Sequence, residues 1–257
     1  MKEFSACMVA FACAACGTVR APAPRDIAPT LEEVRAVSPA LERYTREALH
    51  GDLWKRPGLS PRDRSLVTVA TLIARNQTVM EPYHFGFALE NGVTPAELSE
   101  VITHLAFYSG WANAIAAVAA AKPVFDARGI DASQLPAATG ARLPLDEVAE
   151  EKRAAQTDKN FGQVAPGVVR YSEQLLFRDL WLRPDLEPRD RSLVTVSALV
   201  ATGQVAQIAF HLNKAMDNGV TRSEVSEAMT QMAFYAGWPF VFSALPTVKD
   251  VLEKRPN

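Results

Sequence analysis

An internal repeat constrains the fold of this 257-residue chain more than any other feature. Residues 61–69, with the sequence PRDRSLVTV, return unchanged as residues 188–196, which is 127 positions later. In the same register, without a gap, His84 aligns with His211. Each copy of about 100 residues is long enough to bury a core of its own. The repeat therefore predicts a tandem duplication with two similar units.

The signals at the segment ends are those of helices. Ser60 precedes a segment that begins with proline, as is common at helix N-termini. Three capping boxes pair a threonine with a glutamate three residues later: Thr30 with Glu33, Thr94 with Glu97, and Thr221 with Glu224. Residues 66–69 include β-branched side chains, but the length and caps of their segment favour a helix. The sequence thus predicts an all-α fold made of two tandem helical units.

Four segments follow from these signals. A stretch with prolines, glycines and short polar residues separates the two copies and is typical of a linker. The predicted boundaries are a leader at 1–21, a first repeat at 30–128, a linker at 129–145 and a second repeat at 146–257.

The leader has the layout of a secretory signal. A short apolar run of small residues follows Lys2 and is too short to span a bilayer as a helix. The residues around Cys16 resemble a bacterial lipobox, so a lipid anchor on Cys16 is one expectation. We therefore expect an exported, periplasmic or lipid-anchored protein. The alternative is a cytoplasmic protein with an unstructured leader.

Charge restricts the partners. The formal net charge is −2, and no long run of Lys or Arg provides a surface for a polyanion. Nucleic acid is therefore not expected as a partner, whereas a small neutral or anionic ligand remains open. Leu- and Ala-rich helix faces on small units predict that the two repeats pair and that the chain forms a homo-oligomer.

The two aligned histidines are the leading candidates for chemistry. An ordinary pKa near 6.5 suits His84 and His211 to general acid or base catalysis, although a structural histidine would be duplicated equally well. Glu81 lies three residues before His84, where a carboxylate can orient an imidazole. Ile208 takes the matching position in the second repeat, and Gln207 lies four residues before His211. The two sites are therefore not chemically equivalent.

A polar and aromatic stripe recurs in both repeats. His104, Tyr108 and Trp111 follow at i, i+4 and i+7, which is one face of a helix if the helix continues through Gly110. The counterpart consists of Gln231, Tyr235 and Trp238. Such a stripe forms either part of the core or the wall of a substrate site with a few polar groups.

Arg64 and Arg191 open equivalent helices. A cation in the first helical turn opposes the helix dipole, so each arginine needs an anionic partner. That partner is either a carboxylate within the chain or a substrate carboxylate. The histidines lack metal-ligand spacing, and no phosphate-binding loop or dinucleotide fingerprint occurs, so neither a metal nor a cofactor is expected.

These motifs, taken together, resemble the carboxymuconolactone decarboxylase family. The resemblance rests on RDRSLVTV, on the histidine segments that lead to Asn-Gly-Val-Thr, and on the Phe-Tyr and Gly-Trp pairs, each present twice. It implies an all-helical fold, sites between units and oligomers, often trimers or hexamers. One branch of this family consists of alkylhydroperoxidases, which carry cysteines seven and four residues before the histidine. Gln77, Met80, Gln204 and Gln207 stand there instead, which disfavours a peroxiredoxin-like antioxidant activity.

The decarboxylase branch implies a carboxy-lyase that needs no cofactor and acts on a small carboxylated lactone or keto-acid. The implied roles are acid, base or enolate donor for His84 and His211, and orientation by Glu81. Gln207 would be a neutral donor, and Arg64 or Arg191 would bind substrate carboxylates. That branch commonly has a glutamate four residues before the histidine, whereas Met80 and Gln207 stand here. A helical ligand-binding module without turnover is the alternative from a different class.

Overall fold

The computed structural model describes residues 28–255, which form helices and no strand within that range. The all-α prediction is confirmed. The predicted leader and Cys16 lie outside the described residues. None of the described helices is long and apolar enough to cross a bilayer.

The first repeat contains six α-helices and two short helical turns of other types. They are α1 (Leu31–Val37), α2 (Pro39–Tyr44), a π-helix (Thr45–Leu49), a 3₁₀ turn (Leu53–Lys55), α3 (Pro61–Ala74), α4 (Glu81–Glu90), α5 (Pro95–Tyr108) and α6 (Trp111–Ala127).

The second repeat has the same order of elements. A 3₁₀ turn (Ala132–Gln134) lies between the repeats. The elements that follow are α7 (Glu147–Phe161), α8 (Pro166–Tyr171), a π-helix (Ser172–Phe177), a 3₁₀ turn (Leu180–Leu182), α9 (Pro188–Ala201), α10 (Val205–Asp217), α11 (Arg222–Tyr235) and α12 (Trp238–Glu253).

The helices begin where local capping predicts. The Ser60 hydroxyl accepts the Asp63 N–H at the start of α3. All three predicted capping boxes form, at the N-termini of α1, α5 and α11. The sequence predicts residues 166–177 as one helix, but its second half is a π-helix, matched in the first repeat. Wider π turns are common near functional sites, and both precede a tryptophan described below.

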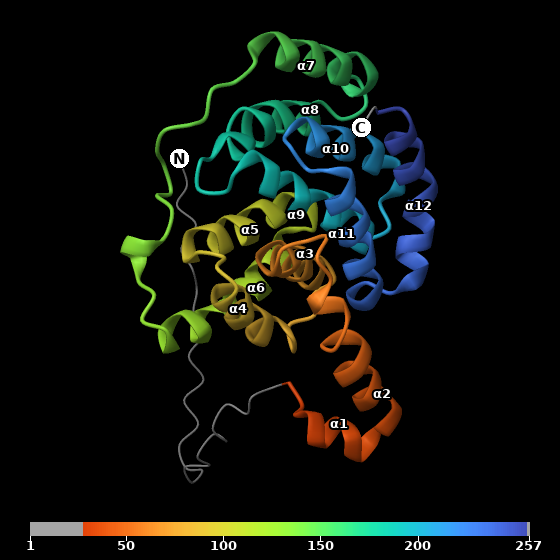
Figure 1. Ribbon diagram of the computed structural model, residues 1–257. Coiled ribbons are helices and arrows are strands. Elements are labelled where there is room, and N and C mark those ends of the chain that lie inside the picture. The colour runs from red at the N-terminus through yellow and green to blue at the C-terminus, as the bar shows by residue number, and fades with distance from the viewer. Residues whose placement is uncertain (1–27, 256–257) are drawn as a thin grey trace, which may run out of the picture.

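Helices α3 and α9 form the centre of the molecule (Figure 1). Nearly every residue of each is buried, so each is covered on all sides. They pack on each other, and each also receives a helix of the opposite repeat: α11 packs on α3, and α5 packs on α9. The core around α3 to α6 contains Val194 and Ala198, and the second core contains Val67. The two repeats therefore share their cores.

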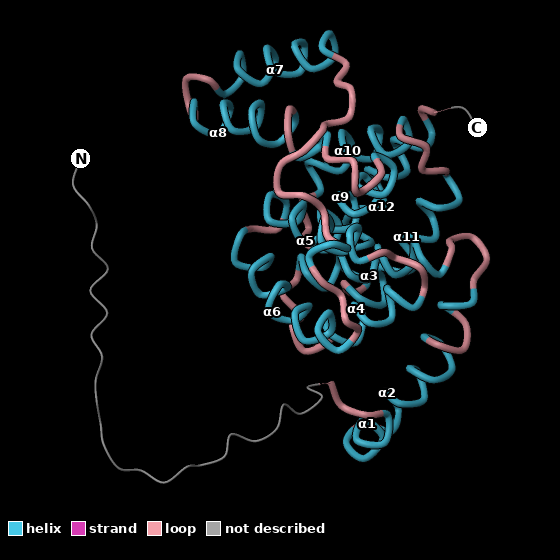
Figure 2. The backbone as a smooth tube through the Cα atoms, turned by 90° about the vertical axis from the view of Figure 1, so that its left-hand side faces the viewer, coloured by secondary structure: helices cyan, strands magenta, loops and turns pink. Residues whose placement is uncertain are grey.

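The remaining helices lie at opposite ends of the molecule. Helices α1 and α2 extend from one end, and α7 and α8 cover the other, as both views show (Figures 1 and 2). Between these ends, α3 to α6 and α9 to α12 form the compact body that holds the candidate site residues.

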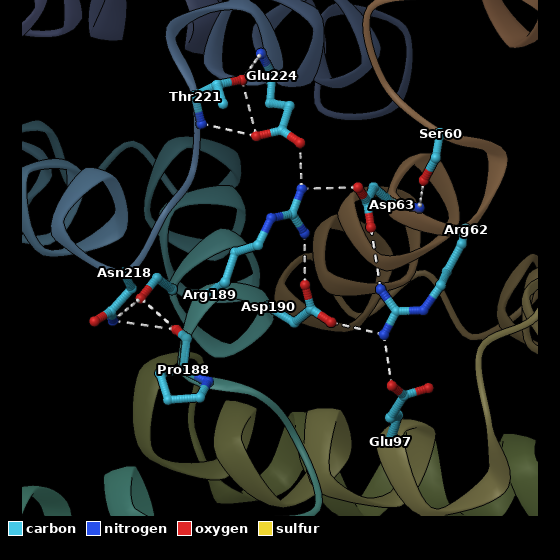
Figure 3. A network of polar contacts seen from close by, with 11 residues as sticks. Ser60, Arg62, Asp63, Glu97, Pro188, Arg189, Asp190, Asn218, Thr221 and Glu224 are labelled. Carbon is cyan, nitrogen blue, oxygen red and sulfur yellow. Dashed lines mark hydrogen bonds and ion pairs between the residues drawn. The ribbon is translucent and has the colours of Figure 1, made fainter.

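A polar network joins the N-terminal ends of α3 and α9 (Figure 3). Arg62 binds Asp190 of the other repeat, and Arg189 binds Asp63 in return. The two arginines also bind a capping-box glutamate each: Glu97 and Glu224, respectively. Because the two aspartates are buried, these reciprocal ion pairs are largely shielded from solvent. The network holds the two repeats in a fixed, twofold-like arrangement.

Candidate functional site

Two clusters of aromatic side chains surround the repeated histidines, and each cluster contains residues of both repeats. We call Trp54, His84 and Tyr235 the first site. The Trp54 Nε1–H donates to the Tyr235 hydroxyl at 2.9 Å. The rings of His84 and Tyr235 meet edge to face with centroids 5.2 Å apart. The tyrosine that faces His84 thus comes from the second repeat.

The second site repeats this arrangement with the repeats exchanged. It consists of Trp181, His211 and Tyr108. The Trp181 Nε1–H donates to the Tyr108 hydroxyl at 2.8 Å, and Tyr108 meets His211 with centroids 5.2 Å apart. Tyrosines at the ends of α5 and α11 reach the opposite repeat because these helices pack on α9 and α3. Neither site can be completed by one repeat alone.

Burial keeps His84 neutral at pH 7. The side chain lies on α4, and the residue is 4% exposed. Removal from water, together with a smaller effect of the nearby His50, lowers its pKa to about 4. Tyr83, which is half exposed, contacts the imidazole edge to face. His84 can therefore act as a neutral base or hydrogen-bond donor close to the protein surface.

Glu81 is a buried carboxyl group without a partner. It lies in the first turn of α4, one helical turn before His84. Among the described residues, neither of its carboxyl oxygens has a hydrogen-bond partner, so the expected bond that orients His84 is not formed. Burial raises the pKa of Glu81 to about 7. The usual order of proton affinity is reversed, since the carboxyl group holds a proton more tightly than the imidazole.

The second site lacks this acid. Ile208 fills the buried position that corresponds to Glu81. Gln207 is exposed, and no hydrogen bond of the described chain joins it to His211. Burial lowers the pKa of His211 to about 4, and its buried Nδ1 has no partner among the described residues. The expected role of Gln207 as a donor beside His211 has no support in this geometry.

Arg64 and Arg191 are fully buried in ion pairs within the chain. Arg64 binds Glu227 at 2.8 Å, and Arg191 binds Glu100 at 3.0 Å. Each of these glutamates belongs to the opposite repeat. Of the two partners left open by the sequence, the structure shows the internal carboxylate, and neither guanidinium faces a substrate. The reason is that α3 and α9 are covered on all sides.

His104 has a structural role. It is fully buried, and its Nδ1 faces the Arg191 Nη1–H at 3.4 Å. Its Nε2 lies 2.7 Å from the Thr195 hydroxyl, which itself donates to a backbone carbonyl. A neutral imidazole protonated on Nε2 satisfies all of these groups. Burial also holds the pKa of His104 well below its usual value. The structure thus places His104 in the core, with both ring nitrogens in contact with other side chains of the protein, and not in the wall of a substrate site.

Gln231 makes the same contacts in the other repeat. Its Oε1 accepts from Arg64 at 3.1 Å, and its Nε2 donates to Thr68 at 3.0 Å. A histidine and a glutamine thus replace each other, since each supplies one acceptor and one donor in a similar position.

Trp111 and Trp238 lie away from both sites. Helix α5 ends at Tyr108, and Gly110 has a φ of 99°, so the helical face does not continue to Trp111. Trp111 is 63% exposed and contacts Phe107, and Trp238 lines an apolar groove on the outer face of α11 and α12. The expectation that these tryptophans belong to the substrate site is therefore not met.

The homo-oligomer that the Leu- and Ala-rich helix faces predict stays a prediction.

Several site residues were not identified from the sequence. Trp54 and Trp181 are visible in the repeat, but nothing in the local sequence places them against a tyrosine of the other copy. Lys214, whose Nζ lies over the Trp181 ring, follows His211 by three residues, a spacing that could have identified it. His50, which contributes to the lowered pKa of His84, directly follows a π-helix, and no pattern in the neighbouring sequence points to it.

Comparison with known proteins agrees with this arrangement of two copies. The profile of the carboxymuconolactone decarboxylase family matches residues 39–123 and again 166–250. A 4-carboxymuconolactone decarboxylase of Acinetobacter baylyi is 35% identical over 107 residues, which is 42% of this chain and 80% of that protein. A nitrosuccinic acid decarboxylase of Metarhizium robertsii is 37% identical over 79 residues, covering 29% of this chain and 55% of that protein.

A solved structure shows the same fold. It is described as a gamma-carboxymuconolactone decarboxylase subunit from Burkholderia xenovorans. The TM-score is 0.51 at 17% identity, and the match covers 88% of this chain and 92% of that one.

Proposed function

The chain belongs to the carboxymuconolactone decarboxylase family, and on that premise we propose that it is a carboxy-lyase for a small carboxylated lactone or keto-acid. The proposal includes catalysis without a cofactor, because a conjugated carbonyl of the substrate can itself accept the electrons left by CO2. The two related decarboxylases named above support this class of reaction.

One observation carries the assignment to the first site. Glu81 is buried without a partner, with a pKa raised by burial to about 7, one turn before a neutral His84. Decarboxylation must end with delivery of a proton to carbon, and a carboxyl group that remains protonated near neutral pH is suited to this. We therefore place the reaction at the first site.

The bond between the leaving carboxylate and its carbon breaks, CO2 departs, and the electron pair delocalises into the carbonyl as an enolate. The Glu81 carboxyl group gives its proton to that carbon and regains one from water. His84 and the Tyr235 hydroxyl stabilise the enolate oxygen as donors. Tyr235 accepts from Trp54, which leaves its own proton available, and burial raises its pKa so that the proton stays in place.

The test is turnover of 4-carboxymuconolactone by the purified chain. CO2 release and the loss of ultraviolet absorbance from the conjugated lactone are followed together, with nitrosuccinic acid as a second compound. We expect turnover by the parent, and its loss in Glu81→Gln and in a His84→Ala/His211→Ala double variant that keeps its helicity.

Glu90→Gln is the matched control. Glu90 lies on the same helix α4, is exposed, and pairs with Arg128 outside the site. This variant should retain the parent rate. A parent inactive on both compounds would overturn the named substrates, and full activity of Glu81→Gln would overturn the role of Glu81.

A further inference from the structure

The two sites have the same arrangement of tryptophan, tyrosine and histidine but differ in their charged groups. Both have a tryptophan bonded to a tyrosine beside a histidine. At the position of Glu81 the second site has Ile208, and at the position of Phe87 it has Lys214. The first site therefore contains an unpaired acid, whereas the second contains a cation.

Lys214 is a cation without an anionic partner. Its Nζ lies over the Trp181 ring, 4.8 Å from the centroid, and the side chain is half-buried. Within the described chain it makes no ion pair, although Glu150 and Asp217 lie near enough to favour its charged form. Glu150 binds Arg153, and Asp217 binds Arg255. A half-buried ammonium group that is left unpaired favours an external anion.

Two further polar groups surround the same tryptophan. Tyr108 accepts the Trp181 N–H, and no acceptor for its own hydroxyl proton is found among the described residues. His211 stacks on Trp181 with ring centroids 6.2 Å apart, and its Nδ1 has no partner in the described structure. Together with Lys214, these groups place a charge, a hydroxyl group and a ring nitrogen around one aromatic ring.

Aromatic side chains form the rest of the surroundings. Phe177 stacks on Trp181 at 6.4 Å, and Phe210 meets His211 edge to face at 5.0 Å. Phe210 is 50% exposed, so this side of the site opens to solvent. Flat apolar surfaces beside a cation fit a planar carboxylate better than a phosphate or an inorganic anion, because both the ring and the charge find a contact.

We propose that the second site binds a small planar organic carboxylate, with Lys214 as its charge partner, and holds it without turnover. Ile208 leaves this site without the buried, unpaired carboxyl group that the first site has in Glu81, which is why we assign turnover to the first site alone. The proposal concerns binding and goes beyond the decarboxylase reaction of the first site. The duplicated chain would thus have one reactive site and one anion-binding site.

The test uses a chain in which Trp181 is the one remaining tryptophan. The chain has four tryptophans, so Trp54→Phe/Trp111→Phe/Trp238→Phe leaves fluorescence from the second site alone. Benzoate is the probe, and benzamide is the neutral probe of the same shape. We expect benzoate to change the Trp181 emission in a saturable way, with a Kd at least about tenfold lower than that of benzamide.

Substitution of the lysine completes the test. In this background Lys214→Met should raise the Kd for benzoate at least about tenfold, whereas Lys214→Arg should retain most of the affinity. Lys122→Met, which removes an exposed lysine of α6, is the matched control and should leave the Kd unchanged. Circular dichroism checks the fold of each variant.

Three results would overturn the proposal: no saturable response to benzoate, equal affinity for benzamide, or an unchanged Kd in Lys214→Met. Turnover of 4-carboxymuconolactone is measured separately on the parent chain and reports on the first site. If benzoate does not bind, the decarboxylase proposal is unaffected, and if the parent does not turn over the lactone, the binding proposal is unaffected.

Discussion

Trp54 in the first repeat donates its indole N–H to the hydroxyl of Tyr235 in the second, at 2.9 Å. Trp181 and Tyr108 make the reciprocal bond at 2.8 Å. The two repeats thus exchange one tyrosine each, and every histidine site is built from both copies. Because this arrangement is the same at both sites, the tryptophan, tyrosine and histidine are preserved while the charged groups beside them differ.

The exchange predicts which tyrosine matters for turnover. Tyr235→Phe removes a donor to the proposed enolate at the first site, so we expect kcat to fall by about 10²-fold. Tyr108→Phe removes the equivalent hydroxyl at the second site and should lower kcat less. Each substitution should cost about 1 kcal/mol of stability through the lost hydrogen bond. Steady-state kinetics and urea unfolding of both variants test this, and equal losses of kcat would contradict the assignment.

The raised pKa of Glu81 predicts how kcat falls on the basic side of its pH profile. Since burial raises the pKa of Glu81 to about 7, the protonated form that delivers the proton is lost as the pH rises through 7. We expect kcat to fall above that pH. Glu90→Gln should keep this limb, because Glu90 lies outside the site. A rate that stays constant up to pH 9, about two units above this pKa, would argue against Glu81 as the acid.

The same carboxyl group makes stability depend on pH. Its folded pKa of about 7 exceeds the ordinary 4.5, so the folded state binds the proton more tightly. The free energy of unfolding therefore falls as the pH rises from 4.5 to 7, by on the order of 3 kcal/mol at most. Glu81→Gln removes this loss, so its stability relative to the parent should rise over that range and then level off.

His84 and His211 act in the opposite direction. Burial lowers the pKa of each to about 4, so the folded state disfavours their protonation, and stability is lost as the pH falls from 6.5 towards 4. Urea unfolding of the parent and Glu81→Gln between about pH 4.5 and 8 separates these effects. A stability difference between the two proteins that does not change with pH would contradict the raised pKa of Glu81.

The match between His104 and Gln231 predicts an asymmetric response to substitution. His104→Gln keeps one acceptor for Arg191 and one donor to Thr195, so its stability should stay near that of the parent. His104→Leu leaves both groups unsatisfied in the core and should cost about 1–3 kcal/mol more. Thermal or urea unfolding tests this, and a glutamine variant as unstable as the leucine variant would show that the two repeats are not interchangeable here.

Helix positions and the duplication could be predicted because their causes are local. The hydroxyl of Ser60 and the capping boxes at Thr94 and Thr221 act on backbone groups three residues away, and a repeated motif needs no structure to be seen. The π-helices were missed, since a hydrophobic pattern does not distinguish a π turn from an α turn.

The sequence alone determined the all-α fold, the tandem repeat and the family, because caps, periodicity and motif order are properties of neighbouring residues. Tertiary structure decided the chemistry of each side chain. It paired Arg64 and Arg191 with glutamates of the opposite repeat, placed Tyr108 beside His211, and buried Glu81 without a partner. Burial and partnership depend on helices far apart in the chain, and these set the proton affinity and charge on which function depends.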